Sequence, residues 1–195
     1  MKALLKTSLL GLALVSTASM AELADFTGPE LGATLAVSNG KLKSASDSIS
    51  DTSAGVALHA GYGIEATKDI AVLFGLDYNL SNVKSGTGES DDGERQNIYF
   101  KNPYSLSLGA GSLVSDNTLA YAKVSYESAK YSYGKNNSTL EGYGLGAGAR
   151  YLLNKSTYVQ GELKYTEYTK NNGKNIDNIT FSNTQFNIGL GVMFK

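Results

Sequence analysis

The chain has 195 residues, of which 42% are hydrophobic and 18% are charged, and it contains 22 Gly, 2 Pro and no Cys. This length predicts a single domain. With 17 basic and 18 acidic residues, the chain has no strong field to attract nucleic acid. The absence of Cys excludes disulfides, thiolate metal sites and a cysteine nucleophile, and a single His excludes most histidine metal sites. No cofactor and no metal are therefore expected.

The N-terminus has the pattern of an export signal. Lys2 and Lys6 precede a short apolar run at residues 9–15, and small residues follow at the positions that a signal peptidase needs. We therefore predict a signal peptide over residues 1–21, cleaved after Ala21, and a mature domain over residues 22–195.

In the rest of the chain, apolar and polar residues alternate with a period of two, which predicts strands that each have one apolar face. The last segment shows it most clearly, with these apolar residues on one face and polar residues, Met or Gly on the other: Phe186, Ile188, Leu190, Val192 and Phe194. The same alternation occurs in seven earlier segments: 30–37, 55–64, 70–79, 104–111, 120–127, 142–151 and 158–165. The sequence therefore predicts an all-β protein with eight strands.

The connections between these segments alternate between long and short. The long ones are rich in Ser, Asn, Gly, Asp and Lys and cover residues 39–53, 81–97, 129–140 and 169–183; the tight turns cover residues 66–69, 115–118 and 154–157. Transmembrane barrels have long extracellular loops and short periplasmic turns. This layout predicts an eight-stranded antiparallel up-and-down transmembrane β-barrel with four polar extracellular loops.

The strands of a water-soluble lipocalin barrel show the same alternation of apolar and polar residues, so alternation alone does not say which face points inward. The positions of the glycines do. Almost all strand glycines lie on the polar face, and only Gly161 lies on the apolar face. Small residues on the inner face of a narrow barrel make room for a few large side chains. The polar face is therefore predicted to point inward and the apolar face to meet lipid.

Charged residues of both signs fall on the predicted inner face, where opposite charges can pair. We expect an interior polar network that plugs the barrel, formed by Asp77, Lys123, Arg150, Glu162 and Lys164. His59 also falls on this face and is interpreted as an interior histidine with satisfied hydrogen bonds. No catalytic, cofactor-binding or metal-binding residue is predicted.

Four segments carry a resemblance to a known family: FTGPELGATLAVS (26–38), YSLSLGAG (104–111), LAYAKVSY (119–126) and EGYGLGAGARYLL (141–153). They resemble the OmpA-like eight-stranded outer-membrane β-barrel family, also labelled porin-family proteins. The resemblance covers essentially the whole mature chain. It implies a location in the outer membrane of a Gram-negative bacterium. It also implies that the assembly machinery reads an apolar C-terminal strand ending in Phe. Phe194 fits that signal, although Lys195 follows it.

Three functions remain open at this stage. The first is a structural and surface-interaction role, in which outer-membrane lipids surround a monomeric barrel and the loops are candidates for binding a host or environmental ligand. The second is a small-solute pore, although eight strands usually leave no continuous channel. The third, least favoured, is a lipid A-modifying barrel enzyme that would use His59. We favour the first.

Overall fold

The computed structural model describes residues 22–44, 48–81, 83–89, 95–133, 136–171, 174–175 and 179–195. The predicted signal peptide, with its cleavage site at Ala21, lies outside these residues. No helix in this part of the chain is long and apolar enough to cross a membrane.

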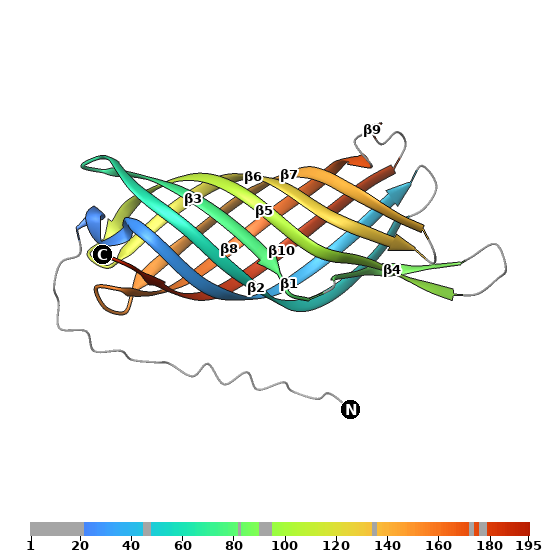
Figure 1. Cartoon of the computed structure of the whole chain (residues 1–195), viewed down its shortest axis with the longest axis horizontal. Helices are drawn as coiled ribbons and strands as arrows, with labels where there is room; N and C mark the ends of the chain where they lie inside the picture. Colours follow the sequence, from blue (N-terminus) through green and yellow to red (C-terminus); the bar gives the residue numbers. More distant parts are fainter. Residues whose placement is uncertain are drawn as a thin grey trace, which may run out of the picture.

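In the described part of the chain, eight antiparallel strands form a closed up-and-down barrel, which confirms the predicted fold (Figure 1). They are β1 (Gly28–Ser44), β2 (Ser48–Thr67), β3 (Ile70–Asn79), β5 (Arg95–Ser115), β6 (Thr118–Tyr133), β7 (Asn136–Leu152), β8 (Thr157–Asn171) and β10 (Ile179–Met193). Each strand pairs with its neighbours in sequence, and β10 closes the barrel by pairing with β1. Two short strands extend this barrel: β4 (Val83–Glu89) pairs with β5, and β9 (Lys174–Asn175) pairs with β8.

The two faces of each strand have opposite environments. On β1, Leu31 and Leu35 point outward and are 55% and 66% exposed, whereas Thr34 and Ser38 are buried inside. The same contrast follows the other strands, so large apolar side chains cover the outside of the barrel. An apolar outer band is the surface that lipid requires. This is the facing that the glycine pattern predicts.

The strands are longer than predicted, which corrects the expectation of four long loops. Residues 39–53 were expected to form a loop, but β1 continues to Ser44 and β2 begins at Ser48, with Lys41 opposite Ser50. The connections between β6 and β7 and between β8 and β10 shorten in the same way. Beyond the membrane the outward positions become polar, as at Lys41 and Lys43, so the outward apolar repeat that reveals a lipid-facing strand ends. The backbone hydrogen bonds of the ladder continue because they do not depend on side-chain polarity.

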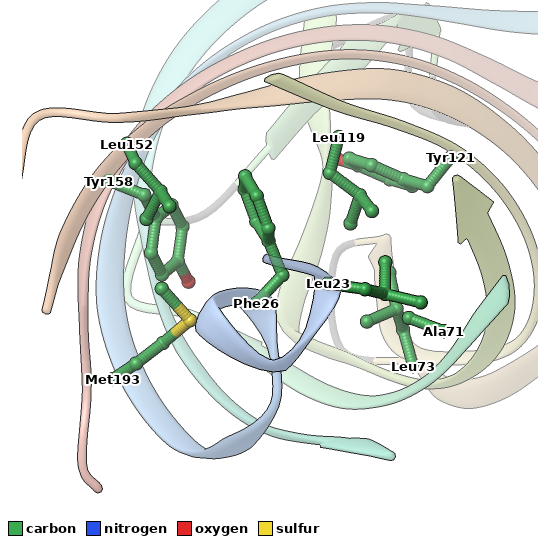
Figure 2. Packing of buried hydrophobic residues seen from close by; sticks show 9 residues of the cluster. All are labelled: Leu23, Phe26, Ala71, Leu73, Leu119, Tyr121, Leu152, Tyr158 and Met193. Carbon is green, nitrogen blue, oxygen red and sulfur yellow. The ribbon is translucent and has the colours of Figure 1, made fainter. Parts of the chain in front are cut away.

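The inside of the barrel has three layers. A charged layer occupies the middle and is described below. At the end that carries the tight turns, an apolar cluster consists of Leu23, Phe26, Ala71, Leu73, Leu119, Tyr121, Leu152, Tyr158 and Met193 (Figure 2). At the opposite end, Ala129, Leu140, Tyr168 and Phe181 form a second cluster, with Leu42 packed against it. The interior is therefore partly apolar at both ends, where the predicted polar network does not extend.

A short 3₁₀ helix, η1 (Leu23–Phe26), supplies the centre of the first apolar cluster (Figure 2). Phe26 is 1% exposed and Leu23 is 4% exposed, so both side chains are inserted into the mouth of the barrel. Lys195 forms an ion pair with Asp25 on the exposed side of η1. The residue that follows the C-terminal Phe thus ties this helix to the end of β10.

The Asp25 carboxyl titrates below its ordinary range. Burial opposes its ionisation, but hydrogen bonds from Lys195 and from the Glu22 backbone N–H, together with the charges of Lys195 and Lys155, lower the pKa of Asp25. The stabilisation from this ion pair is therefore complete above pH 3.8, the ordinary value, and is lost only as the pH falls through the lower value of the folded state.

Inner-face glycines provide the space that the large interior side chains occupy. A Cβ atom at Gly191 would overlap the ring of Tyr158, and a Cβ atom at Gly148 would lie 2.7 Å from the Tyr121 hydroxyl. A Cβ atom at Gly161, which faces outward, would meet nothing within 4 Å. The two faces therefore differ in how they tolerate a methyl group.

Replacing Gly191 with Ala is expected to destabilise the barrel by about 1–3 kcal/mol, because the Tyr158 ring is buried and cannot move away. Gly161→Ala is the matched control and is expected to leave stability unchanged or slightly raised. Urea titration of both variants refolded in lipid vesicles measures the difference. Equal midpoints would contradict the assignment of Gly191 to a filled interior.

Candidate functional site: the charged layer of the interior

Charged side chains reach the middle of the barrel from strand positions whose register partners on the neighbouring strands are often glycines. Lys123 on β6 lies opposite Gly109 on β5 and Gly146 on β7. Glu162 on β8 lies opposite Gly148. Since inward positions alternate along each strand, the register places long charged side chains beside positions with no side chain. This arrangement allows a narrow barrel to hold several ionic groups.

Arg150 is a buried cation of this layer and pairs with Glu30 across the barrel. Its Nη1 donates to Glu30 Oε2 and its Nη2 donates to Glu30 Oε1, both at 2.8 Å. Its Nε donates to the side-chain oxygen of Gln160 at 3.3 Å. The guanidinium lies between two rings, 5.4 Å from the centre of Tyr121 and 4.9 Å from that of Tyr158. The pair is bidentate and further stabilised by cation–π contacts.

His59 joins Glu30 to Asp77. Its Nδ1 lies 2.7 Å from Asp77 Oδ1 and its Nε2 lies 2.9 Å from Glu30 Oε1. Carboxylates accept hydrogen bonds, so an imidazolium that donates from both nitrogens satisfies both contacts. Ser105 donates to Asp77 Oδ2 at 3.2 Å rather than to the histidine. In this geometry both ring nitrogens already have carboxylate partners, so neither is placed to activate a serine.

Two lysines complete the layer. Lys123 Nζ lies 2.8 Å from Glu162 Oε2 and 3.7 Å from Asp77 Oδ2. The Tyr121 hydroxyl donates to Glu162 Oε2 at 2.9 Å, and Asn187 donates to Glu162 Oε1 at 3.2 Å.

Lys164 donates to both oxygens of Glu127, at 3.0 and 3.2 Å. Ser125 donates to Glu127 Oε1 at 2.6 Å. Each of the acids Glu30, Asp77, Glu127 and Glu162 thus has a cationic partner.

The five residues predicted for the network all face inward, but they are not one directly bonded set. Asp77, Lys123 and Glu162 contact one another through Lys123. Arg150 pairs instead with Glu30, and Lys164 pairs with Glu127. Glu30 and Glu127 occupy inward positions in the alternation of their strands, which is the sequence signal that places them inside. The alternation does not specify which charged residues pair with each other. The outward residues of β10, from Phe186 to Phe194, are exposed on the lipid face. Their role in assembly stays a prediction.

One small space in this layer lies among described residues. A cavity of about 20 Å³ lies among His59, Ser107, Tyr121, Lys123 and Glu162. That is room for about one water molecule. Among the described residues no group of His, Asp and Glu is arranged to hold a metal ion. The layer is therefore a packed ionic core with partnered charges.

The closed barrel, its apolar outer band and its ionic interior define an integral β-barrel of the bacterial outer membrane. The family model "Outer membrane protein beta-barrel domain" matches residues 7–194, and the chain belongs to this family. The protein is thus an integral outer-membrane protein of a Gram-negative bacterium.

Solved structures with similar folds are also outer-membrane barrels. Neisserial surface protein A matches with a TM-score of 0.55 and 19% identity over 84% of this chain and 97% of the other. OprG from Pseudomonas aeruginosa matches with a TM-score of 0.53 and 12% identity, over 86% of this chain and 96% of the other. Ail, the attachment invasion locus protein of Yersinia pestis, matches with a TM-score of 0.51 and 16% identity, over 86% of this chain and 99% of the other. At these identities the likeness shows the fold alone. No curated protein matches the chain.

Proposed function

We propose that this protein is a structural and surface-interaction protein of the outer membrane. A sealed barrel anchors it, and the extracellular strand ends carry recognition. The observation that supports this most directly is the interior, which holds two apolar clusters and an ionic layer between them. A barrel filled in this way favours anchoring over transport. We further infer that residues 1–21 direct export and that the outer-membrane assembly machinery inserts the mature chain.

A small-solute pore is the second candidate, and the filled interior argues against it. A solute would have to pass the Phe26 cluster and then the buried pair of Arg150 and Glu30. Separating a buried ion pair costs several kcal/mol. A lipid A-modifying enzyme is disfavoured because both nitrogens of His59 face carboxylates.

The extracellular end supports the recognition part of the proposal. The ladder between β1 and β10 continues to the pair Ser44 and Ile179, well beyond the last large apolar outward residue of β1, Val37. Hydrogen-bonded strands of this kind hold their own ends in fixed positions, which suits binding. Ail, which shares the fold, has been solved in complex with the heparin analogue sucrose octasulfate. A polyanionic surface ligand is therefore a sensible first probe for this chain.

The test combines conductance with binding. Refolded residues 22–195 in a planar bilayer are expected to insert without discrete conductance steps, whereas reproducible steps would favour the pore. Binding to cells or matrix is then compared between the full barrel and variants that lack residues 131–138 or 172–180. Heat-modifiable gel mobility confirms that each variant has folded. Unchanged binding by both deletion variants would contradict the recognition role.

A further inference from the structure

Two lysines face each other on the outside of the barrel near its extracellular end. Lys101 on β5 and Lys130 on β6 are direct partners in the register, and both are exposed. Among the ion pairs of the described residues, neither lysine takes part. Like charges directly opposite each other on adjacent strands destabilise a sheet. An anion bound between the two ammonium groups would remove that repulsion.

Below these lysines, a furrow crosses the lipid-facing surface from β8 to β3. Its upper part, of about 550 Å³, lies among Val124, Tyr126, Tyr143, Leu145 and Tyr165. Tyr126 is four residues from Lys130 along β6, a distance of about 13 Å in an extended strand. The tyrosines form the rim where the apolar band ends, and the ring centres of Tyr126 and Tyr143 are 6.2 Å apart.

The furrow continues towards the middle of the membrane. Its lower part, of about 540 Å³, shares Val124 and Leu145 with the upper part, so the two are continuous. Ala110 and Ala122 are register partners there, and the larger Leu108 and Val124 are the next outward pair. Small side chains between larger ones make a depression in which a hydrocarbon chain gains contact with more atoms than on a flat surface.

Among the acids whose side chains the structure describes, the two near this face lie on one side of it. Glu167 lines the upper part of the furrow and accepts a hydrogen bond from the Tyr165 hydroxyl at 3.3 Å. Glu141 on β7 is the register partner of Ser128, two residues from Lys130. Both acids lie on β7 and β8, whereas the two lysines lie on β5 and β6. An anionic headgroup is therefore attracted to the β5–β6 side and repelled from the β7–β8 side.

We propose that this face binds an outer-leaflet glycolipid, with a phosphate group between Lys101 and Lys130 and acyl chains in the furrow below. The charge of the lysines matches the phosphate, and the tyrosine rim lies at the level where headgroup and chains meet. The furrow accepts the chains by dispersion contacts and burial of apolar area. The proposal depends on the outer-membrane location and not on a ligand at the loops.

The test uses the refolded barrel in detergent, with native mass spectrometry to measure how much lipid A stays bound. Diphosphorylated lipid A is compared with the same lipid after removal of its phosphates, and inorganic phosphate is added as a competitor. Replacing Lys101 or Lys130 with Gln is expected to weaken retention of the phosphorylated lipid about fivefold for each lysine. Ala122→Phe, which fills the furrow, is expected to weaken retention of both lipids.

Matched controls separate this site from general attraction. Lys41 and Lys43 on β1 are exposed at the same end of the barrel but lie opposite Ser and Thr residues, so the Lys41→Gln and Lys43→Gln variants should retain lipid like the wild type. Ala33→Phe places the same side chain on the lipid-facing side of β1. Equal losses in the β1 and β5–β6 variants would overturn the proposal, as would equal retention of the two lipids. Full displacement by millimolar inorganic phosphate would also overturn it, because the furrow would then contribute nothing.

Discussion

Replacing Arg150 with Met is expected to lower the free energy of unfolding by about 3–5 kcal/mol, because it leaves the Glu30 carboxylate buried without its main partner. Met fills much of the same volume, so the loss reflects charge more than packing. The chain has no Trp. Tyrosine fluorescence and heat-modifiable gel mobility are therefore the suitable signals for urea unfolding of the barrel in vesicles.

A double-mutant cycle separates the stranded charge from the lost contacts with the tyrosine rings. Glu30→Gln removes the negative charge and keeps a side chain that can face His59. The double variant Arg150→Met, Glu30→Gln is expected to recover part of the stability lost by Arg150→Met alone. If the double variant is no more stable than Arg150→Met, the stranded carboxylate is not the cause.

Replacing Phe26 with Ala is expected to destabilise the barrel by about 3–5 kcal/mol, because the ring is almost fully enclosed by residues of several strands. The substitution would also leave a cavity at the end of the barrel closed by η1. The free energy of unfolding in urea, measured in the same vesicles, tests the first effect. The conductance baseline tests whether water then enters from that end.

Asp25→Asn is the control for this prediction, because it alters η1 without touching the cluster. It removes only the partly exposed ion pair with Lys195, and such pairs contribute less than about 1 kcal/mol. A large loss in Asp25→Asn, or an unchanged midpoint in Phe26→Ala, would mean that η1 does not act as an apolar plug.

The barrel and the facing of its strands could be predicted because both leave a periodic trace in the sequence. A barrel strand in lipid must alternate apolar outward and polar inward residues. The contrast between Gly161 and the inner-face glycines reflects a real difference in the space available to a Cβ atom. The strand ends could not be found in this way. Lys41 and Lys43 occupy outward positions where apolar residues no longer recur, so no outward apolar repeat distinguishes a ladder from a loop.

The interior was predictable as a composition and not as a set of contacts. Alternation places Arg150 and Glu30 on the inner face, but they are separated by 120 residues and meet only through the curvature of the closed barrel. The plug was missed for a different reason. Leu23 and Phe26 form one turn of a 3₁₀ helix, which is too short to show a helical period, and their burial depends on a mouth built by other strands.

The strand extensions set how far the protein stands above the bilayer. On β1 the large apolar outward residues end at Val37 and the ladder continues to Ser44, so about seven residues of tilted strand rise roughly 18 Å above the hydrocarbon. The ends of these strands therefore stand clear of the lipid headgroups as a hydrogen-bonded collar. Under the proposed function, substitutions at the strand ends would change which partner is bound while the collar keeps their height constant.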